Sequence, residues 1–547
     1  MGAVPAVLVL VLACAQQPPL QAEPGALLEQ LISQYVALQR DSDGRDPIFT
    51  EAASEASLAR KARLLKQLEQ IDGAALHPDQ RIDRRYLVGV LETDIDMARA
   101  QRRWETDPAM YLPSRDLGLL LDPSAARPVE ERAAILGELL ARASAQLGLA
   151  RANLRRPPQR FTREAIFQAR QTLESIEAHG GAFHELPVAV ALDSFAGRLR
   201  AHLAFLEQEL LPRSDGSWAF GKVHYDRVLQ RRWFLDADAE DILARGWRAF
   251  EETEALAQQV AERMEPGRHW TEVYESLKAQ HPPADGIKAA YQEQMDRARG
   301  FVLEHSLVSL PEGERVVTID TPAAMRRSSP FGTFQTVSAH DDGMEGRLVL
   351  TPIESWMSPE QQAQRLRSHH HAWIPVIAVH EAYPGHHTHA LKTREHPRIL
   401  RRVAREPIFS EGWGLFTEEM MYQEGFLVGD DVRLTQLRNR LWRAARVILD
   451  TSLHTGRMSF DEAVSFLVER VRFEPYAAEL EVGMYVRRPT YVLGYLIGMQ
   501  ELMAIRDEYV RRHGEPEPPS EFYDRLLGVG SLPPALAREA LLGAADG

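Results

Sequence analysis

The segment Ile377–His387, with the sequence IAVHEAYPGHH, predicts a helix that is interrupted and then starts again. Its first residues are apolar, whereas Pro384 lacks a backbone donor and the glycine after it permits dihedral angles that end a helix. On an unbroken helix His386 would lie about 9 Å along the axis from His380, which is too far for both imidazoles to bind one ion without distortion. We therefore expect a break that brings the two rings together.

Helical patterns dominate the chain on both sides of this segment. Between about residues 24 and 211, apolar residues recur at steps of three and four, which is typical of amphipathic helices. Ser358 and Ser459 each carry the capping-box spacing that begins a helix. Strand patterns are confined to 315–319 (RVVTI) and 347–350 (RLVL). The expected fold class is mainly α with a small β element.

The composition is that of an ordinary globular protein, with 547 residues of which 44% are hydrophobic and 26% are charged. The 64 basic and 78 acidic residues give a net charge of −14, so we expect no binding to nucleic acid. Cys14 is the single cysteine, which excludes an internal disulfide and a metal site built from several thiolates. Any metal must therefore be held mainly by His, Asp and Glu.

Residues 1–22 predict an export leader, because they hold an uncharged apolar run of signal-peptide length that is too short to span a bilayer. Simple cleavage behind this run would give a periplasmic or secreted protein. The Val-Leu-Ala-Cys sequence that ends at Cys14 also resembles a bacterial lipoprotein box, which would make this residue a membrane anchor. The remaining alternative is an apolar N-terminus on a cytoplasmic protein. We divide the rest of the chain into an N-terminal helical region, 23–230, and a catalytic region, 231–547.

Histidines are concentrated in one part of the chain, where seven of the 19 fall between positions 369 and 389. Among them, His380 followed by Glu381 is how a helical zinc-hydrolase motif begins, with an imidazole as metal ligand and a glutamate as the base that activates water. His386 is the expected second ligand, and His387 is its alternative. The triplet 369–371 is expected at the surface or in the shell around the ligands.

A third ligand is expected from a separate helix. Glu411 starts a helical pattern in the segment 410–419 (SEGWGLFTEE) and would complete a His₂Glu site for Zn²⁺ with one position open for water. Glu418 lies two turns further on, so one glutamate is expected to bind the ion while the other orients a histidine. The alternative is a solvated His-rich surface, since His-Glu pairs also arise by chance, as at His184-Glu185.

Several motifs after residue 380 belong together. They are His380-Glu381-x-x-Pro384-Gly385-His386-His387, Glu411-Gly412-Trp413, Arg443-Ala444-Ala445-Arg446, Asp450, His454, Pro489 to Tyr495 and Gly498. With these motifs the chain resembles the DUF885 family, which is grouped with zinc metallopeptidases of the gluzincin type. The resemblance covers most of the chain after about residue 25.

The resemblance implies a multihelical, two-lobed, zinc-peptidase-like fold around a deep channel. It also implies that His380 and His386 are metal ligands, that Glu411 is the third ligand and that Glu381 is the general base. In one late motif the chain differs from the family, which usually has Pro-Gly-Gln where Pro489-Thr490-Tyr491 stands here. This difference concerns contacts with the substrate and not the metal.

Hydrolysis of a peptide bond also needs a donor for the oxyanion that forms opposite the metal. Tyr495 and His454 are the candidates for this catalytic role, and Tyr491 is a second choice that would contact the substrate. Packing between helices is the alternative role for the tyrosines, and a structural set of hydrogen bonds is the alternative for His454.

Two arginines, Arg443 and Arg446, are expected to bind a substrate carboxylate unless they only pair with acidic neighbours. The expected partner is thus a peptide substrate, and the expected function is that of a zinc metallopeptidase. Two other functions stay open, namely a catalytically inactive protein that binds metal and peptide, and a zinc hydrolase of another amide or ester.

Overall fold

The computed structural model describes residues 23–42, 50–123, 125, 127–322, 326, 332–337, 343–354 and 357–543. The predicted leader at residues 1–22, including Cys14, lies outside these ranges. The described chain is mainly helical and carries one small sheet, which confirms the fold class expected from the sequence. The two lobes, the deep channel and the division after residue 230 stay predictions.

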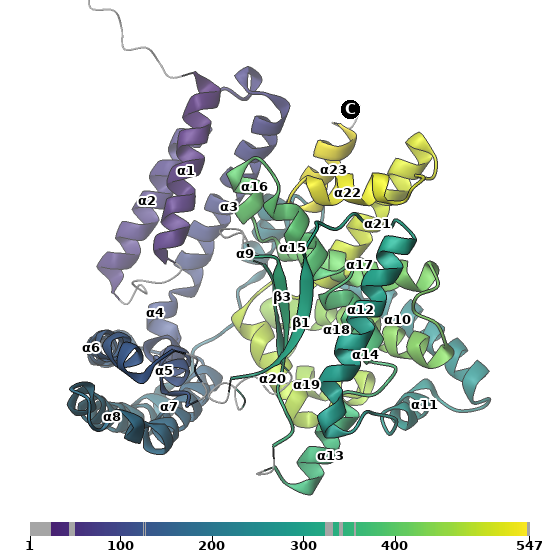
Figure 1. Ribbon diagram of the computed structural model, residues 1–547. Coiled ribbons are helices and arrows are strands. Elements are labelled where there is room, and N and C mark those ends of the chain that lie inside the picture. The colour runs from purple at the N-terminus through teal and green to yellow at the C-terminus, as the bar shows by residue number, and fades with distance from the viewer. Residues whose placement is uncertain are drawn as a thin grey trace, which may run out of the picture.

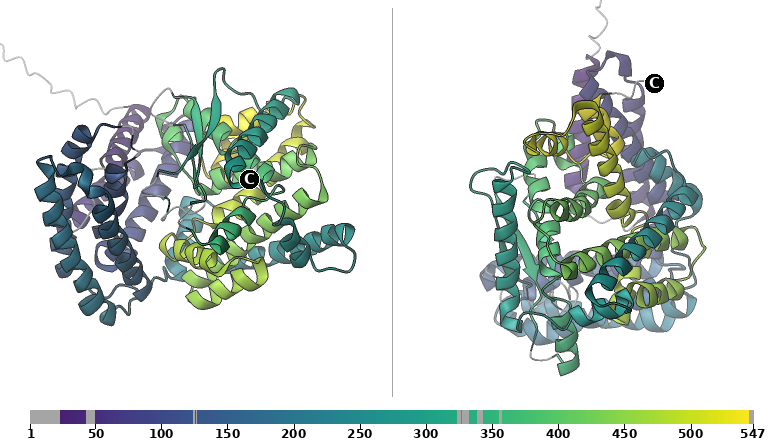
Figure 2. Two further views of the ribbon diagram at one scale, coloured as in Figure 1. Left: turned by 60° about the horizontal axis from the view of Figure 1, so that its bottom comes forward. Right: turned by 90° about the vertical axis from the view of Figure 1, so that its right-hand side faces the viewer.

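Helices α1–α8 lie together on one side of the molecule, on the left in Figure 1 and in the left view of Figure 2. Helices α5–α8 enclose a hydrophobic core of their own that includes Leu136, Phe183 and Phe195. The helices of this part are α1 (Pro24–Ser42), α2 (Glu51–Glu69), α3 (Pro78–Gln101), α4 (Arg103–Thr106), α5 (Ser114–Leu121), α6 (Val129–Asn153), α7 (Gln159–His179), α8 (Val188–Phe205) and α9 (Lys222–Arg227).

The remaining helices surround the histidine-rich segment. Ser358 and Ser459 begin α13 and α19 with complete capping boxes, as predicted. Within the described residues, no helix is both long and apolar enough to cross a membrane. The helices of this part are α10 (Ala239–Met264), α11 (Trp270–Leu277), α12 (Ile287–Glu304), α13 (Pro359–Arg367), α14 (Ile374–Glu381), α15 (His386–Arg394), α16 (Ile399–Val403), α17 (Pro407–Gln423), α18 (Asp430–His454), α19 (Phe460–Val471), α20 (Pro475–Arg487), α21 (Leu493–His513), α22 (Ser520–Gly528) and α23 (Pro534–Leu542).

The sheet has three strands in the order β1-β3-β2. Strand β1 (Arg315–Asp320) pairs in parallel with β3 (Glu345–Leu350), and these are the two predicted strands extended by one or two residues. Strand β2 (Thr333–Gln335) was not expected and pairs with β3 in the antiparallel direction. On α12, the side-chain amide of Gln292 bonds the β1 backbone at Val316 O (2.9 Å) and Thr318 N (3.0 Å), so this helix is fixed along β1.

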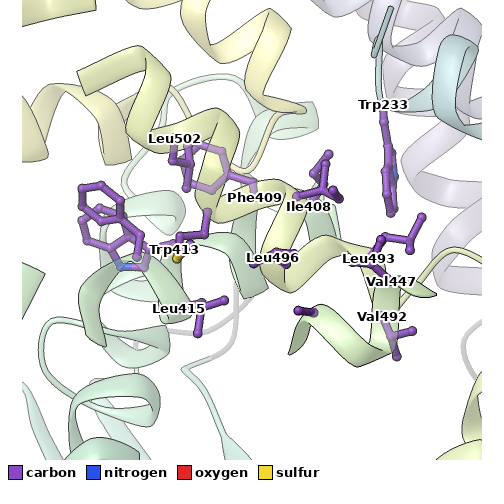
Figure 3. Packing of buried hydrophobic residues seen from close by; sticks show 14 of the residues in the cluster. Trp233, Ile408, Phe409, Trp413, Leu415, Val447, Val492, Leu493, Leu496 and Leu502 are labelled. Atoms are coloured by element: carbon purple, nitrogen blue, oxygen red, sulfur yellow. The ribbon is translucent and has the colours of Figure 1, made fainter. Parts of the chain in front are cut away.

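Helices α17 and α21 cross at the centre of the main core, which extends from α1 to α23. Figure 3 shows Ile408, Phe409 and Trp413 of α17 beside Leu496 and Leu502 of α21. The close approach depends on glycine. A Cβ atom at Gly412 would lie 2.6 Å from the backbone of Gly498, and a Cβ at Gly498 would lie 2.0 Å from Ile408 O. The two helices can pack at this distance because neither carries a side chain at the crossing point.

A buried carboxylate connects the N-terminal helices to the start of α17. Glu406 directly precedes α17 and is fully buried. It accepts a hydrogen bond from the Tyr86 hydroxyl at 2.8 Å and forms an ion pair with Arg232 at 3.0 Å. Arg232 also reaches Asp94 on α3 at 3.1 Å. Because a buried charge is tolerated only with such partners, the position of α17 depends on residues more than 170 positions earlier in the chain.

Candidate metal centre

The histidine-rich segment contains the break that its sequence predicted. Helix α14 ends at Glu381, and α15 begins at His386. A Cβ atom at Gly385 would lie 1.9 Å from His380 O and 2.3 Å from Val379 O, so only glycine fits between the two helices. The ring centroids of His380 and His386 are 4.8 Å apart, with the rings nearly perpendicular at 86°. The interruption therefore brings together two imidazoles that an unbroken helix would separate.

Helix α17 supplies the third member of the group and holds the break in position. The Trp413 indole N–H donates to Pro384 O at 2.8 Å. Gly414 lies directly against the His380 ring, since a Cβ atom there would be 2.7 Å from Cε1. Each residue of the sequence Glu411-Gly412-Trp413-Gly414 thus has a role at the site. Glu411 supplies a carboxylate, and Gly412 allows the close crossing of two helices. Trp413 bonds the backbone at the break, and Gly414 leaves space for the His380 ring.

His380, His386 and Glu411 form a group that is able to hold a metal ion, and their nearest donor atoms all lie within 4.8 Å of one another. Glu411 Oε2 is 3.2 Å from His386 Nε2 and 3.9 Å from His380 Nε2. This oxygen is buried and has no hydrogen-bond partner among the described residues. A buried carboxylate oxygen without a donor, facing two imidazole nitrogens, fits the His₂Glu donor set of a zinc site.

Glu418 lies behind His380 and not in the group itself. Its Oε1 is 2.8 Å from His380 Nδ1, and both side chains are buried. A hydrogen bond at Nδ1 leaves Nε2 of the same ring facing Glu411 and His386. Of the two glutamates considered from the sequence, Glu411 therefore faces the imidazoles and Glu418 orients one of them.

His387 points away from the group. Its Nε2 lies 3.1 Å from Glu314 Oε2, an atom that also accepts the Tyr383 hydroxyl at 2.5 Å. Arg299 binds the other oxygen of Glu314 at 2.6 Å. These buried contacts join the break between α14 and α15 to the start of β1. Nε2 of His387 is thus bound to Glu314, while Nδ1 has no hydrogen-bond partner among the described residues. The structure therefore gives the alternative ligand His387 a packing position.

The charge of the group is determined by the imidazoles of His380 and His386 and by the three carboxylates of Glu381, Glu411 and Glu418. Burial alone would lower the pKa of His380, but the neighbouring carboxylates of Glu411 and Glu418 raise it to about 9. Burial alone would raise the pKa of Glu411, yet the adjacent His386 and His380 hold it well below its ordinary range. The site thus favours positive charge at its centre, which a divalent cation held by His380, His386 and Glu411 would supply while the imidazoles stayed neutral.

Glu381 and the two tyrosines lie around this group. Glu381 ends α14, is partly exposed and has no hydrogen-bond partner among the described residues. The Tyr491 hydroxyl donates to Glu411 Oε1 at 2.7 Å. The Tyr495 ring stacks near His380, with centroids 6.2 Å apart and an interplanar angle of 12°. Burial and the Glu411 charge raise the pKa of Tyr495 well above its ordinary value, so its hydroxyl keeps its proton at neutral pH.

His454 lies apart from the metal group. Its Nδ1 accepts from the backbone of Phe220 at 3.3 Å, and its Nε2 is 3.0 Å from Tyr485 O. Burial lowers its pKa to about 4. Both ring nitrogens already have backbone partners, which corresponds to the structural role that the sequence left open for this residue.

Arg443 and Arg446 are both buried on α18, the helix that also carries His454. Their Cζ atoms lie 5.7 Å and 4.4 Å from the centroid of the Tyr495 ring. Arg446 forms an ion pair with Glu481 at 3.1 Å. This contact corresponds to the alternative in which these arginines pair with acidic neighbours. The structure therefore brings both arginines to a ring that also contacts a metal-group histidine.

One residue near the site had no signal in the sequence, and another, Thr490, stands where the family usually has glycine. Glu314 stands before β1 with nothing around it that indicates a role, and its partners come from distant parts of the chain. Thr490 has a φ of 70°, where glycine is usual, and its N–H donates to the buried Asp450 at 2.9 Å. For the triplet 369–371 the surface alternative was wrong for two members, because His369 and His370 are buried near tyrosine hydroxyls, and their place in the shell around the ligands stays a prediction.

Comparison with known proteins gives a family and a fold. The model of the DUF885 family, "Bacterial protein of unknown function", matches residues 33–541. Among solved structures, a candidate lipoprotein of unknown function from Shewanella oneidensis has a TM-score of 0.75 at 19% identity, over 95% of this chain and 100% of that one. A candidate lipoprotein from Colwellia psychrerythraea has a TM-score of 0.73 at 16% identity, over 95% and 99% of the two chains. Among curated proteins, none matches.

Proposed function

The chain belongs to the DUF885 family, and from its His380–His386–Glu411 group we propose that it is a zinc-dependent metallopeptidase. The observation that carries this proposal is the buried Glu411 Oε2, which faces two imidazole nitrogens and has no hydrogen-bond donor among the described residues. Membership of the gluzincin type is part of the same proposal. His380, His386 and Glu411 would hold the ion, with the fourth position left to water.

Bound zinc would supply Lewis-acid polarisation of the scissile carbonyl and would make the attacking water more acidic. Glu381 is adjacent to the first ligand, and its carboxylate forms no hydrogen bond or ion pair with the described residues. We assign it the transfer of a proton from the attacking water to the leaving amine. Glu418 keeps the His380 ring in place while this occurs, through the contact at 2.8 Å.

Tyr495 is the better of the two candidates for the donor to the oxyanion. Its hydroxyl stays protonated, it lies beside His380, and it interacts with Tyr491, whose own hydroxyl is on Glu411. A protonated phenol next to a metal ligand is suited to donate a hydrogen bond to a developing negative oxygen. We leave His454 out of the proposed catalytic set because both its ring nitrogens have backbone partners.

We also propose that the protein is exported, and that it is anchored through Cys14 if the leader is processed as a lipoprotein box. Two similar solved structures are those of candidate lipoproteins, which supports this proposal. Metabolic labelling with a fatty-acid analogue tests it, since a Cys14→Ala variant should lose the label and leave the membrane fraction.

The experiment that tests the function combines metal analysis with one substitution. Wild-type protein should contain about one zinc per chain and hydrolyse peptides from a library. A Glu381→Gln variant should keep the zinc and lose hydrolysis, whereas Glu395→Gln, an exposed acid at the end of α15, should change neither.

Each other outcome points to a different function. Zinc without turnover of any peptide would favour a protein that only binds peptide, and turnover of other amides or esters would favour a different hydrolase. Hydrolysis that survives Glu381→Gln would remove this residue as the base. A protein without stoichiometric metal, and with His380→Ala, His386→Ala and Glu411→Ala variants that behave like wild type, would contradict the site.

A further inference from the structure

Three guanidinium groups of α18 gather around one tryptophan beside the metal group. The Cζ atoms of Arg438, Arg443 and Arg446 lie 5.9, 4.3 and 4.0 Å from the centroid of the Trp442 ring. All three arginines are at least nine-tenths buried, with exposed fractions of 6%, 4% and 4%. Arginine is the most weakly hydrated basic side chain and stacks well on aromatic rings, but buried positive charge still requires an opposite charge.

The described residues supply only one carboxylate to this group. Arg446 pairs with Glu481 at 3.1 Å, whereas no described acidic side chain comes within 4 Å of Arg438 or Arg443. The Nε atoms of all three arginines, and Nη1 of Arg446, are buried and have no hydrogen-bond partner in the part of the chain that the structure describes. The group therefore holds more positive charge, and more free donors, than the protein neutralises.

Arg443 is the member with the weakest partners. Within the described ranges it makes one hydrogen bond, a long one of 3.4 Å from Nη1 to Asn439 O. Burial lowers its pKa, and the like charges of Arg446 and Arg438 lower it further, while Glu418 acts in the opposite direction. Glu418 is already engaged with His380 at 2.8 Å, so it serves the metal group first.

The arginines are close enough to the metal group to act on the same substrate. Arg443 Cζ is 5.7 Å from the centroid of the Tyr495 ring, which is 6.2 Å from the centroid of the His380 ring. Together these distances limit the separation of the Arg443 guanidinium and the His380 ring to about 12 Å. An extended peptide advances about 3.3–3.6 Å per residue, so at most about three residues of substrate span this interval.

We propose that Arg443, supported by Arg446, binds the free C-terminal carboxylate of a peptide, so that the enzyme cleaves within the last three residues of its substrate. This inference rests on the proposed function, since it names the substrate class of the same site. A guanidinium fork matches a carboxylate with two parallel N–H···O bonds, and the unpartnered Nε of Arg443 provides one of these donors. Arg438 would then contribute charge and not direct contact.

The test uses three peptides with the same internal sequence. The first has neutral side chains and a free C-terminal acid, the second has the same sequence with a C-terminal amide, and the third is the amide with a glutamate as its last residue. Values of kcat/KM are measured on the zinc-loaded full chain. Binding of fluorescently labelled versions is measured by anisotropy on Glu381→Gln protein, which cannot hydrolyse them if the proposed base is correct.

For wild type, the free acid should exceed the amide by about 100-fold or more, because a site built for a charged group rejects the analogue that lacks it. In Arg443→Gln the ratio of kcat/KM for the acid peptide to kcat/KM for the amide should fall to near one. The value for the acid peptide should fall, and the value for the amide should not change. Arg440→Gln serves as the matched control, since Arg440 is on the same helix but lies 3.9 Å from Glu419. This control should keep the wild-type ratio.

Three results would overturn the inference. Equal use of acid and amide by wild type would show that no terminal carboxylate is recognised, and this comparison needs no variant that might fail to fold. If the amide peptide that ends in glutamate has the same kcat/KM as the free acid, the site binds acidic side chains and not the terminal carboxylate. An Arg443→Gln variant that loses both peptides equally would give this arginine a structural role.

The two levels of the argument fail separately. Hydrolysis without preference for the free acid would leave the metallopeptidase proposal intact and contradict the inference about Arg443. Selective binding of the free acid that depends on Arg443, without hydrolysis of any peptide, would support the inference and contradict the metallopeptidase proposal.

Discussion

Nδ1 of His380 lies 2.8 Å from Oε1 of Glu418, and this contact joins the end of α14 to the middle of α17 in the interior of the protein. A carboxylate on one imidazole nitrogen selects the tautomer that leaves the other nitrogen free for a metal. The pair therefore determines which face of His380 the ion would meet.

A Glu418→Gln substitution keeps the shape of this contact and removes its charge. We expect zinc affinity to fall by about 10- to 100-fold, as is usual when the partner of a metal-binding histidine is changed. Competition with a chromogenic chelator measures this directly. Glu419→Gln is the control, because the neighbouring Glu419 pairs with Arg433 and should leave the affinity unchanged. Equal affinity of wild type and Glu418→Gln would mean that the pair has no part in metal binding.

Gly414→Ala should disturb the site with little effect on the rest of the fold. The added Cβ would lie 2.7 Å from Cε1 and 2.9 Å from Nε2 of His380, so the ring must move. We expect bound zinc and hydrolysis to be lost while the far-UV circular dichroism spectrum stays that of wild type. In Gly483→Ala, on α20, the new Cβ meets no atom within 4 Å. That variant should keep its zinc and gain up to about 1 kcal/mol of stability from helix propensity.

Thr490→Gly should stabilise the protein. A β-branched residue at a φ of 70° is strained, and glycine adopts this conformation without that cost. After the entropy that glycine adds to the unfolded chain, we expect a net gain of about 1 kcal/mol in the free energy of unfolding, measured by urea denaturation. Thr435→Gly, inside α18, should instead lose at least about 1 kcal/mol, because it lowers helix propensity and removes a buried side chain. A loss of stability in Thr490→Gly would show that the threonine side chain contributes more than the strain costs.

Asp450 should make stability depend on pH. Burial raises its pKa to about 7 in the folded protein, from an ordinary value of 3.8. The folded state thus holds a proton that the unfolded state releases near pH 4. The stability from this group is complete below about pH 4 and is lost as the pH rises to about 7. Asp450→Asn imitates the protonated form, so its free energy of unfolding should gain on that of wild type by an amount on the order of 4 kcal/mol between pH 4 and pH 8. A difference that stays constant with pH would show that Asp450 is not protonated in the fold.

Local signals in the sequence were sufficient for the elements that have them. The serine caps of α13 and α19, the apolar runs of β1 and β3, and the proline and glycine between α14 and α15 each act through the backbone of a few residues. Strand β2 has three residues and exists through its pairing with β3, so no local pattern indicates it.

The same distinction applies to the site. His380, His386 and Glu411 were predicted because a metal site restricts residue type and spacing. The choice between His386 and His387 depended on the direction in which the chain leaves the break, and Glu314 determines the position of His387 from a different part of the chain. Contacts of this kind, between residues 73 positions apart, have no counterpart in a window of sequence.

The buried carboxylate of Glu406 has a consequence for the evolution of this protein. The residue stands at the start of the helix that carries Glu411, its charge is balanced by Arg232, and it accepts a hydrogen bond from Tyr86. A gene fragment that begins at residue 231 would keep the arginine but would encode neither the tyrosine nor Asp94, the second partner of that arginine. Recombination at that point would leave a buried acid short of donors five residues before the proposed ligand. We therefore expect the first hundred residues and helix α17 to evolve together. A substitution of Tyr86, Arg232 or Glu406 should be accompanied by substitutions of the other two.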